Sequence, residues 1–268
     1  MSLGGLHRSL TPGPQSPWAL AANALLSVLL APRCAACGLL LDRPLGGPIC
    51  DACWAAVRPI TPPVCDACGD ALPSWRVVSC GAARCPRCRR TTWAVDRGRT
   101  IGAYDGALRH IIHALKYGGR RSVARRLGQL MRDHAGDLLS GVDYAVPVPL
   151  HPRRQRARGF NQAAELALTL GLPAYVLLGR VRYTPPQVAL PAARRHANVR
   201  DAFRLMRERS WGLARSRLPG VSNCCVLLVD DVSTTGATLD ACARVLKRAG
   251  AREVRALTGA RVALRRPS

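Results

Sequence analysis

The strongest pattern in the chain is a short apolar run followed by a polar turn and a helical repeat. Val226–Val229 is four apolar residues in a row, which indicates a strand buried on both faces of a sheet. Two acids and a hydroxyl-rich turn follow it. From Ala237 to Ala249 apolar residues recur at helical spacing, and Gly250 is placed to end that helix. The pattern therefore predicts strand, loop and helix in that order.

Helices and strands also alternate in the middle of the chain. The expected elements are a helix over 108–115 that stops at Gly118-Gly119, a helix from 121 to about 139, a strand over 144–150 closed by prolines, and a helix over 163–170. The segment 151–162 carries four arginines and a glycine, and we expect it to be a loop that closes over a pyrophosphate; the alternative is a solvated arginine face. This alternation predicts a three-layer α/β fold with a mainly parallel sheet and a ligand at the carboxyl ends of the strands.

The N-terminal apolar run is too short to cross a membrane. Trp18–Ala31 spans about fourteen residues and contains Asn23 and Ser27, whereas a spanning helix needs roughly twenty apolar residues. A signal peptide is a poor fit because residues 1–17 hold a single arginine among several Gly, Ser and Pro. We expect an amphipathic helix that packs on its own protein, with peripheral membrane association as the alternative. The predicted location is the cytoplasm.

The charge of the chain is strongly positive. Its 268 residues include 40 Lys and Arg against 16 Asp and Glu, a formal net charge of +24, and only Lys116 and Lys247 are lysines. Such a surface attracts polyanions, and arginine side chains suit phosphate. A codon bias toward arginine is the alternative explanation. With 48% apolar residues the chain can still form a core.

The cysteines are concentrated in one segment with metal-ligand spacing. Eight of the twelve form four C-x-x-C pairs: Cys34 and Cys37, Cys50 and Cys53, Cys65 and Cys68, Cys85 and Cys88. Two such pairs complete a tetrahedral four-thiolate zinc site, and the order predicts two consecutive zinc ribbons. Gly38 and Gly69 follow their pairs where left-handed backbone is often required. Cys80 could replace Cys85 as a ligand, although the second C-x-x-C makes Cys85 the better candidate.

Two other roles are possible for cysteines in such pairs. Disulfides would require an oxidising compartment, and nothing in the sequence indicates secretion. A thioredoxin-type dithiol would be one pair before a helix, not four pairs in a proline-rich segment. Cys224, Cys225 and Cys242 fall in a predicted core strand and helix, where they are expected to act as small buried apolar residues.

The turn between residues 233 and 238 has the composition of a phosphate-binding loop. The hydroxyls of Ser233, Thr234, Thr235 and Thr238 and the free backbone N–H groups before the helix would meet at one point, which favours a phosphate dianion. Asp230 and Asp231 cannot bind the same anion. Their natural partners are the hydroxyls of a ribose, or a divalent cation through water. The alternative is an ordinary strand-to-helix connection with exposed acids.

This segment closely resembles the PRPP-binding signature of type I phosphoribosyltransferases. The resemblance implies that Asp230 and Asp231, as the catalytic pair, bond the ribose 2′- and 3′-hydroxyls of PRPP, and that Mg²⁺ accompanies the ligand. It also implies a 5′-phosphate cradle formed by Ser233, Thr234, Thr235, Gly236, Ala237 and Thr238.

A wider set of short motifs resembles the ComF family, a phosphoribosyltransferase-like group associated with DNA uptake in naturally transformable bacteria. In chain order these are the paired zinc motifs and the segments 104–106, 115–117, 146–150, 158–162, 184–187, 198–203 and 226–238. The resemblance implies a tail and helix over 1–31, a double zinc ribbon over 32–93 and a phosphoribosyltransferase-like domain over 97–268. It further implies a pyrophosphate loop at Val148, Pro149 and Leu150, a mobile flap from Arg153 to Asn161, and Lys116 near the site. A helix C-terminal charge is the alternative for Lys116.

The sequence leaves the reaction open. Purine salvage members often carry Asp where Thr234 stands, and a threonine cannot act as a general base near neutral pH. No segment identifiable as a hood defines a nucleobase pocket. Three hypotheses follow: a PRPP–Mg²⁺ binding protein used in DNA uptake or processing, together with proteins of the competence machinery; a phosphoribosyltransferase with an unidentified acceptor; and a single-stranded DNA-binding zinc protein. Two Phe, five Trp and five Tyr make a long base-stacking platform a poor expectation.

Overall fold

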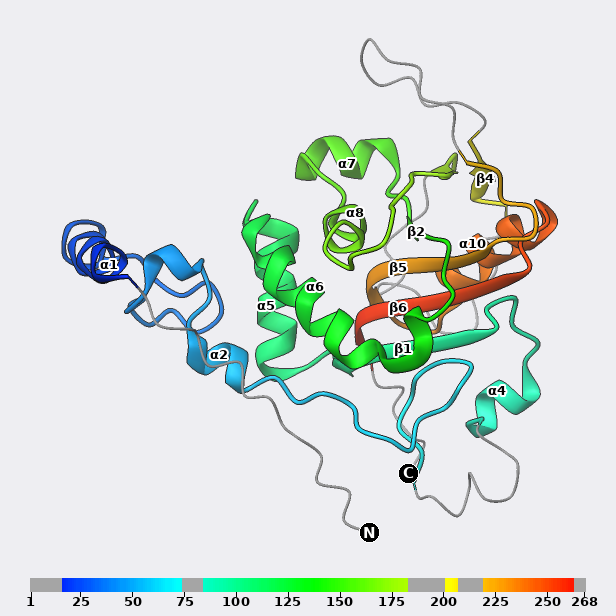
Figure 1. Ribbon diagram of the computed structural model, residues 1–268, viewed down its shortest axis with the longest axis horizontal. Coiled ribbons are helices and arrows are strands. Elements are labelled where there is room, and N and C mark those ends of the chain that lie inside the picture. The colour runs from blue at the N-terminus through cyan, green and yellow to red at the C-terminus, as the bar shows by residue number, and fades with distance from the viewer. Residues whose placement is uncertain (1–15, 74–83, 183–200, 207–218, 263–268) are drawn as a thin grey trace.

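The computed structural model of the protein describes residues 16–73, 84–182, 201–206 and 219–262. Four parallel strands form its central sheet in the order β1-β6-β5-β2 (Figure 1). Their bounds are Arg97–Ala103 for β1, Glu253–Arg261 for β6, Cys225–Ser233 for β5 and Tyr144–Pro147 for β2. The predicted parallel sheet is confirmed, and β5, which carries the two acids, lies inside it.

Helices cover both faces of this sheet and complete the predicted three layers (Figure 1). One face is covered by α5 (Gly106–Tyr117), α6 (Ser122–Ala135) and α8 (Gln162–Ala167), and the other by α10 (Ala237–Arg248). Alternate residues of β5 serve the two cores: Leu227 and Val229 pack in the first, and Val226 and Leu228 in the second. A strand that is buried on both sides explains why this run contains no polar residue.

A small antiparallel pair of strands was not predicted from the sequence. β3 (Leu178–Arg180) pairs with β4 (Phe203–Leu205), and β4 packs beside α10. Two of the sequence motifs, 184–187 and the first half of 198–203, lie outside the described residues. At three residues each, these strands are too short for periodicity to reveal them.

The N-terminal helix α1 (Pro17–Leu30) differs from the expected amphipathic helix. Its side-chain hydrogen bonds to the rest of the protein come from two polar residues: Asn23 Oδ1 accepts a hydrogen bond from the Leu45 N–H at 3.0 Å, and Ser27 Oγ donates to the Leu41 carbonyl at 3.0 Å. Trp18 is 85% exposed and Val28 82%. The expectation that its apolar residues pack on the protein is therefore wrong for most of them, because the polar stripe faces inward.

No helix in the described part of the chain has the length and apolarity that crossing a bilayer requires.

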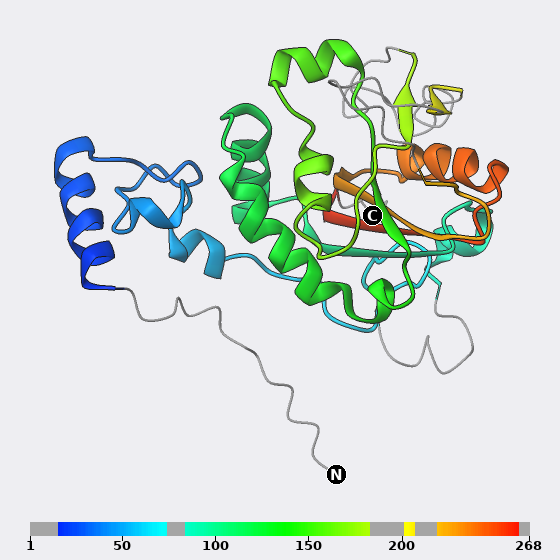
Figure 2. The same cartoon turned by 45° about the horizontal axis from the view of Figure 1, so that its top comes forward.

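In the described part of the cysteine-rich segment, the helices near the C-x-x-C motifs (the zinc knuckles) are short. These are the 3-10 helix η1 (Pro44–Gly46), α2 (Asp51–Ala55) and α4 (Pro86–Arg90). Gly38 and Gly69 have φ angles of +77° and +75°, as their positions after the knuckles predicted. The first ribbon, with the cysteines from Cys34 to Cys53, lies beside α5 at the edge of the molecule. The second ribbon, with those from Cys65 to Cys88, includes α4 and lies below the sheet (Figure 2).

Several predicted boundaries are corrected by the structure. The segment expected to be a loop over 151–162 contains a helix, α7 (Pro152–Arg158), because Pro152 suits the first turn, the His151 ring caps the Arg153 N–H at 3.2 Å and Gly159 closes it at φ +77°. The helix expected to reach Leu139 ends at Ala135, where Gly136 adopts φ +57°, and a 3-10 turn, η2 (Gly136–Leu139), follows.

The strands and the remaining helix also shift at their ends. β5 continues through both acids to Ser233 and does not stop before them, since β6 pairs with it along that length. β2 stops at Pro147, and α8 covers only part of the predicted 163–170 helix. The helix predicted over 237–249 is confirmed to within one residue.

Candidate phosphoribosyl site and zinc centres

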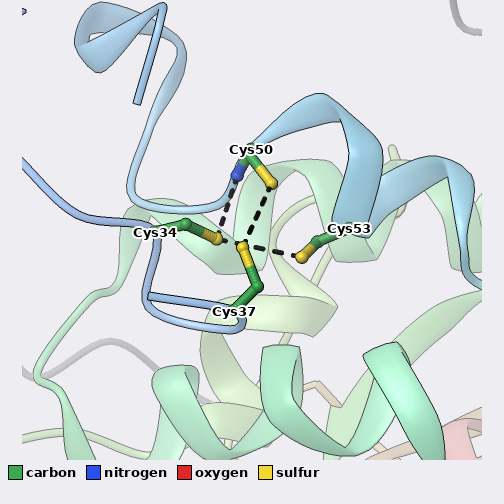
Figure 3. A group of neighbouring side chains, drawn as sticks. All are labelled: Cys34, Cys37, Cys50 and Cys53. Atoms are coloured by element: carbon green, nitrogen blue, oxygen red, sulfur yellow. Dashed lines mark hydrogen bonds between the residues drawn. The ribbon is translucent and has the colours of Figure 1, made fainter. Parts of the chain in front are cut away.

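The eight paired cysteines form two clusters, each with one ligand set. The first set is Cys34, Cys37, Cys50 and Cys53 (Figure 3), and the second is Cys65, Cys68, Cys85 and Cys88. Within each set all sulfurs lie within 4.8 Å of one another, as around a single tetrahedral ion. Sulfur pairs such as Cys37 and Cys50, 3.7 Å apart, are too distant for a disulfide bond, and these cysteines are free thiols. Cys80 lies outside the described residues.

The backbone around the clusters is arranged for thiolates. The N–H of Cys50 points at Cys34 Sγ at 3.3 Å, and the N–H of Cys85 points at Cys65 Sγ at 3.2 Å. Burial opposes ionisation of Cys34, but the N–H donors led by Cys50 outweigh it and lower its pKa to about 6. In the second cluster the side-chain hydrogen bond with Cys65 is the largest influence on Cys88 and raises its pKa to about 12. The four sulfurs of each cluster would all ionise only around a cation, and their spacing fits two structural zinc sites.

Asp231 forms a buried ion pair at the carboxyl end of β5. Its Oδ2 lies 3.0 Å from Lys116 Nζ, at the end of α5, and both side chains are at least 85% buried. Burial alone would lower the pKa of Lys116, but the charge and the hydrogen bond of Asp231 reverse this and raise it. The Lys116 ammonium also lies 5.8 Å from the centre of the Tyr104 ring. Lys116 thus faces the acid pair, in addition to its place at a helix end.

Asp230 faces the opposite side of the sheet. Its Oδ1 accepts a hydrogen bond from the Asp231 N–H at 2.9 Å. Burial, followed by the charge of Asp231, raises the pKa of Asp230 well above its usual range. On this side lie Cys242, whose pKa is raised by burial and then by the Asp230 charge, and Arg180. Adjacent strand residues point to opposite faces, so the two carboxylates flank the strand end.

The loop after β5 leads directly into α10. Ser233, Thr234 and Thr235 are buried, and the Ser233 hydroxyl has no hydrogen-bond partner among the described residues. Gly236 adopts φ +82° and Ala237 is the first residue of the helix. The loop therefore presents a buried hydroxyl and the N-terminus of a twelve-residue helix at one place, which is chemistry suited to an anion. Thr238 lies in the first turn of that helix.

The segment after β2 is held against the same strand end. The N–H of Val148 donates to the Val229 carbonyl at 2.9 Å, and Asn161 Nδ2 donates to the Val148 carbonyl at 3.0 Å. Pro149 follows this fixed residue. In α7 the Arg153 side chain is exposed, whereas Arg154 is close enough to Arg180 that its charge, after burial, lowers the Arg180 pKa. The charges of both Arg154 and Asp230 act on Arg180, which therefore lies between the α7 arginines and the acid pair.

Three residues near the site could not have been found from the sequence. Arg180 sits in the unpredicted strand β3, with its guanidinium 5.3 Å from the Phe203 ring centre. In the sequence, Arg87 is only one of the two residues between Cys85 and Cys88, and Trp93 lies in the segment that links the ribbon to β1. Arg87 Nη1 nevertheless donates to the Thr235 carbonyl at 3.4 Å. No local pattern marks such contacts between distant segments.

The fold and the cysteine clusters define the class of protein: a double zinc ribbon followed by a phosphoribosyltransferase domain. The double zinc ribbon domain family matches residues 25–89, which contain both clusters, and the phosphoribosyl transferase domain family matches residues 156–265. The second match includes the acid pair and the loop that follows it.

Whole-protein relatives identify the family. Competence protein F of Haemophilus influenzae is 30% identical over 186 residues, 65% of this chain and 76% of that protein. DNA utilization protein YhgH of Escherichia coli is 34% identical over 182 residues, 63% of this chain and 74% of that protein. Competence protein ComFC of Bacillus subtilis is 24% identical, covering 60% of this chain and 62% of that protein. The chain belongs to the ComF family.

Proposed function

We propose that this protein binds PRPP with Mg²⁺ at the carboxyl end of β5. The observation that carries the proposal is the sequence of groups there: two carboxylates on the strand end, then a buried unpartnered hydroxyl and the start of α10. Carboxylates accept hydrogen bonds from sugar hydroxyls, and a helix N-terminus stabilises a phosphate dianion. A phosphorylated sugar uses both sets of groups, because its hydroxyls can donate to the carboxylates while its phosphate meets the helix N-terminus.

Each group has a role in this proposal. Asp230 and Asp231 accept hydrogen bonds from the ribose hydroxyls, and the 5′-phosphate is held by the loop from Ser233 to Thr238. The pyrophosphate lies toward Val148 and Pro149, with Lys116 and the α7 arginine Arg153 adding positive charge. Mg²⁺ bound with PRPP would neutralise part of the pyrophosphate charge, and the Asp230 and Asp231 carboxylates could hold it through water. The Lys116–Asp231 pair supports this arrangement, since the 3.0 Å contact fixes the Asp231 side chain at the strand end.

Calorimetry tests the proposal. PRPP with Mg²⁺ should bind the wild-type protein, and the double variant Asp230→Ala, Asp231→Ala should lose at least about a hundredfold in affinity, because two charge-assisted hydrogen bonds are removed. Asp133→Ala removes an exposed carboxylate from α6 and is the matched control, with unchanged affinity. Equal affinity in the double variant and the wild type would remove the ribose assignment.

We infer that the ligand-binding protein serves the uptake or use of DNA. The names of the relatives, Competence protein F and DNA utilization protein YhgH, support this inference. The net charge of +24 supports direct contact with single-stranded DNA through arginine. Oligonucleotide binding should then weaken steeply with salt. If oligonucleotide affinity did not change with salt, or if no oligonucleotide bound, direct contact with DNA would be contradicted. The protein could then act in DNA uptake only through partner proteins of the competence machinery.

Transfer of the phosphoribosyl group is a second candidate function. The bond from C1 to the pyrophosphate oxygen would break, with its electron pair leaving on pyrophosphate, as a nitrogen acceptor bonds to C1 and gives up a proton. The neighbouring charges of Arg154 and buried Arg180 support it, because they stabilise a departing anion. Pyrophosphate release measured across nucleobases and amines decides the matter: no release at confirmed PRPP occupancy would count against transfer.

A further inference from the structure

We propose that the second zinc ribbon, which holds Cys65, Cys68, Cys85 and Cys88, helps to shape the phosphate-binding loop over 233–238. In this proposal Arg87 is the residue that positions the loop backbone. The proposal deepens the function proposed above and rests on it. Arg87 lies in α4, between the two ligands Cys85 and Cys88 of one zinc cluster. Its Nη1 reaches the carbonyl of Thr235, 148 residues away in the chain, at 3.4 Å. A residue fixed by the metal cluster therefore touches the loop that faces the phosphate.

The contact sets the direction of one loop amide. In a trans peptide the carbonyl and the following N–H point in opposite directions. Because the Thr235 carbonyl is directed at Arg87, the N–H of Gly236 points away from the ribbon. Reversal of this peptide would turn a carbonyl oxygen toward the side that the N–H now faces, and a carbonyl repels an anion. Arg87 thus stabilises the one peptide orientation that suits a phosphate.

Trp93 restricts the same loop from the linker side. A Cβ atom added to Gly236 would lie 3.0 Å from the Trp93 ring, so the indole packs directly on the loop backbone. The Arg87 guanidinium lies 5.3 Å from the centre of that ring, which holds both side chains together. The linker after Trp93 is in turn held to α10, since Asp240 Oδ1 accepts the N–H of Ala94 at 2.8 Å.

The ribbon itself is fixed to the sheet beside the loop. Arg261, the residue of β6 that pairs with Ser233, lies 2.6 Å from Asp70 and donates to the Cys68 carbonyl at 2.9 Å. Asp70 also lies 3.6 Å from Arg87. A chain of polar contacts therefore runs from Arg261 in the sheet through Asp70 to Arg87, which contacts the loop. A Cβ on Gly69 would approach the backbone of β1 to 2.7 Å. The backbone after the Cys65–Cys68 knuckle therefore packs directly against the backbone of that strand.

The first ribbon lacks such a connection in the described structure. It contacts the helical layer, where Arg126 of α6 pairs with Asp51 at 2.6 Å and lies 5.0 Å from the Trp54 ring centre. It lies at the opposite side of the molecule from α4 (Figure 1). The two zinc ribbons have similar knuckles but different neighbours, and only the second touches the phosphate loop among the described residues.

Hydrogen exchange of the full-length zinc-loaded protein tests the proposal without any ligand. Arg87→Met keeps the aliphatic stem and removes the donor, whereas Arg89→Met makes the same charge change at an exposed position of α4. Arg87→Met should increase exchange of the 233–238 amides about 3- to 10-fold and leave the β1 and β2 amides unchanged, with two zinc ions retained. Arg89→Met should behave as wild type.

Ribose 5-phosphate affinity is the second readout of the same variants. We expect a weakening of about 3- to 10-fold for Arg87→Met and none for Arg89→Met. Wild-type exchange in the 233–238 loop of Arg87→Met, or equal effects of both variants, would overturn the positioning role. Failure of the wild-type protein to bind PRPP would instead refute the proposed function, so the two failures are distinguishable. If Arg87→Met loses zinc, exchange is measured on Trp93→Leu, which must show the same loop-specific increase for the proposal to stand.

Discussion

The two neighbouring aspartates experience opposite environments, although they are identical in chemistry. Asp231 is paired with Lys116, whereas Asp230 is held beside that charge pair in a site that raises its pKa. A carboxyl whose pKa is raised on folding stabilises the fold most below its unfolded pKa, and this contribution is lost as pH rises through the folded pKa. The ionised Asp230 therefore lowers the stability of the ligand-free protein, which is a cost consistent with a binding role.

Replacing Asp230 by Asn should stabilise the ligand-free protein. Since the buried negative charge is removed, we expect a gain of about 1 kcal/mol near pH 8, or about 2–4 °C in Tm, that shrinks as pH falls toward the usual aspartate range. PRPP affinity should fall in the same variant. Thermal denaturation across pH measures the first effect, and a Tm at or below wild type throughout would contradict the environment assigned to Asp230.

The Lys116–Asp231 pair should show strong coupling in a double-mutant cycle. Lys116→Met leaves a buried carboxylate unpaired, so we expect a loss of about 2–3 kcal/mol, and Asp231→Asn added to it should restore most of that loss. Urea unfolding of the four proteins measures the coupling. Additive effects would mean that the 3.0 Å contact contributes no interaction energy.

The elements of the core could be predicted from local sequence, and those of the site only in part. The run at Val226–Val229 and the helix after Gly236 were recognisable because burial on both faces and helical spacing leave clear patterns. Spacing alone also gave the two cysteine sets. Helix α7, by contrast, has no apolar stripe among its arginines, so the residue pattern predicts a loop there, and only Pro152 at its start and Gly159 at its end mark a helix.

Contacts between distant segments could not be predicted. The polar stripe of α1 faces inward only because Asn23 finds the backbone of Leu45. Arg87 and Trp93 matter only because the second ribbon packs near α10, and nothing in their own neighbourhood in the sequence indicates this. The assignments of ligand groups to Asp230, Asp231 and the loop remain predictions.

Substitution of two equivalent glycines, one in each ribbon, measures how much the packing of the second ribbon on β1 contributes to the free energy of unfolding. Gly38 and Gly69 have nearly equal positive φ angles, but an added Cβ meets nothing within 4 Å at Gly38 and the β1 backbone at 2.7 Å at Gly69. Gly38→Ala should cost about 1 kcal/mol from backbone strain alone. Gly69→Ala should cost about 3 kcal/mol, because the knuckle must also move off β1. Equal losses in urea unfolding would contradict the close packing of this ribbon.

The two zinc ions of the molecule should be released to a chelator at different rates. The first cluster has an exposed ligand, Cys37, whereas Cys65 and Cys88 of the second are 0% and 1% exposed. A chelator should therefore remove one zinc quickly with little effect on the sheet domain, and the second slowly with a clear fall in Tm. A zinc-sensitive dye recorded with circular dichroism follows both steps, and single-phase release would argue against distinct environments.

The proposed PRPP site combines the end of β5, the 233–238 loop and the second zinc ribbon. A crystal structure of the protein with PRPP and Mg²⁺ tests it most directly. We predict the ribose hydroxyls within 3.2 Å of the Asp230 and Asp231 carboxylates, as hydrogen bonds require, and the 5′-phosphate on the 233–238 amides with the Thr235 carbonyl still directed at Arg87. PRPP bound elsewhere, or a phosphate away from this loop at full occupancy, would contradict this binding mode.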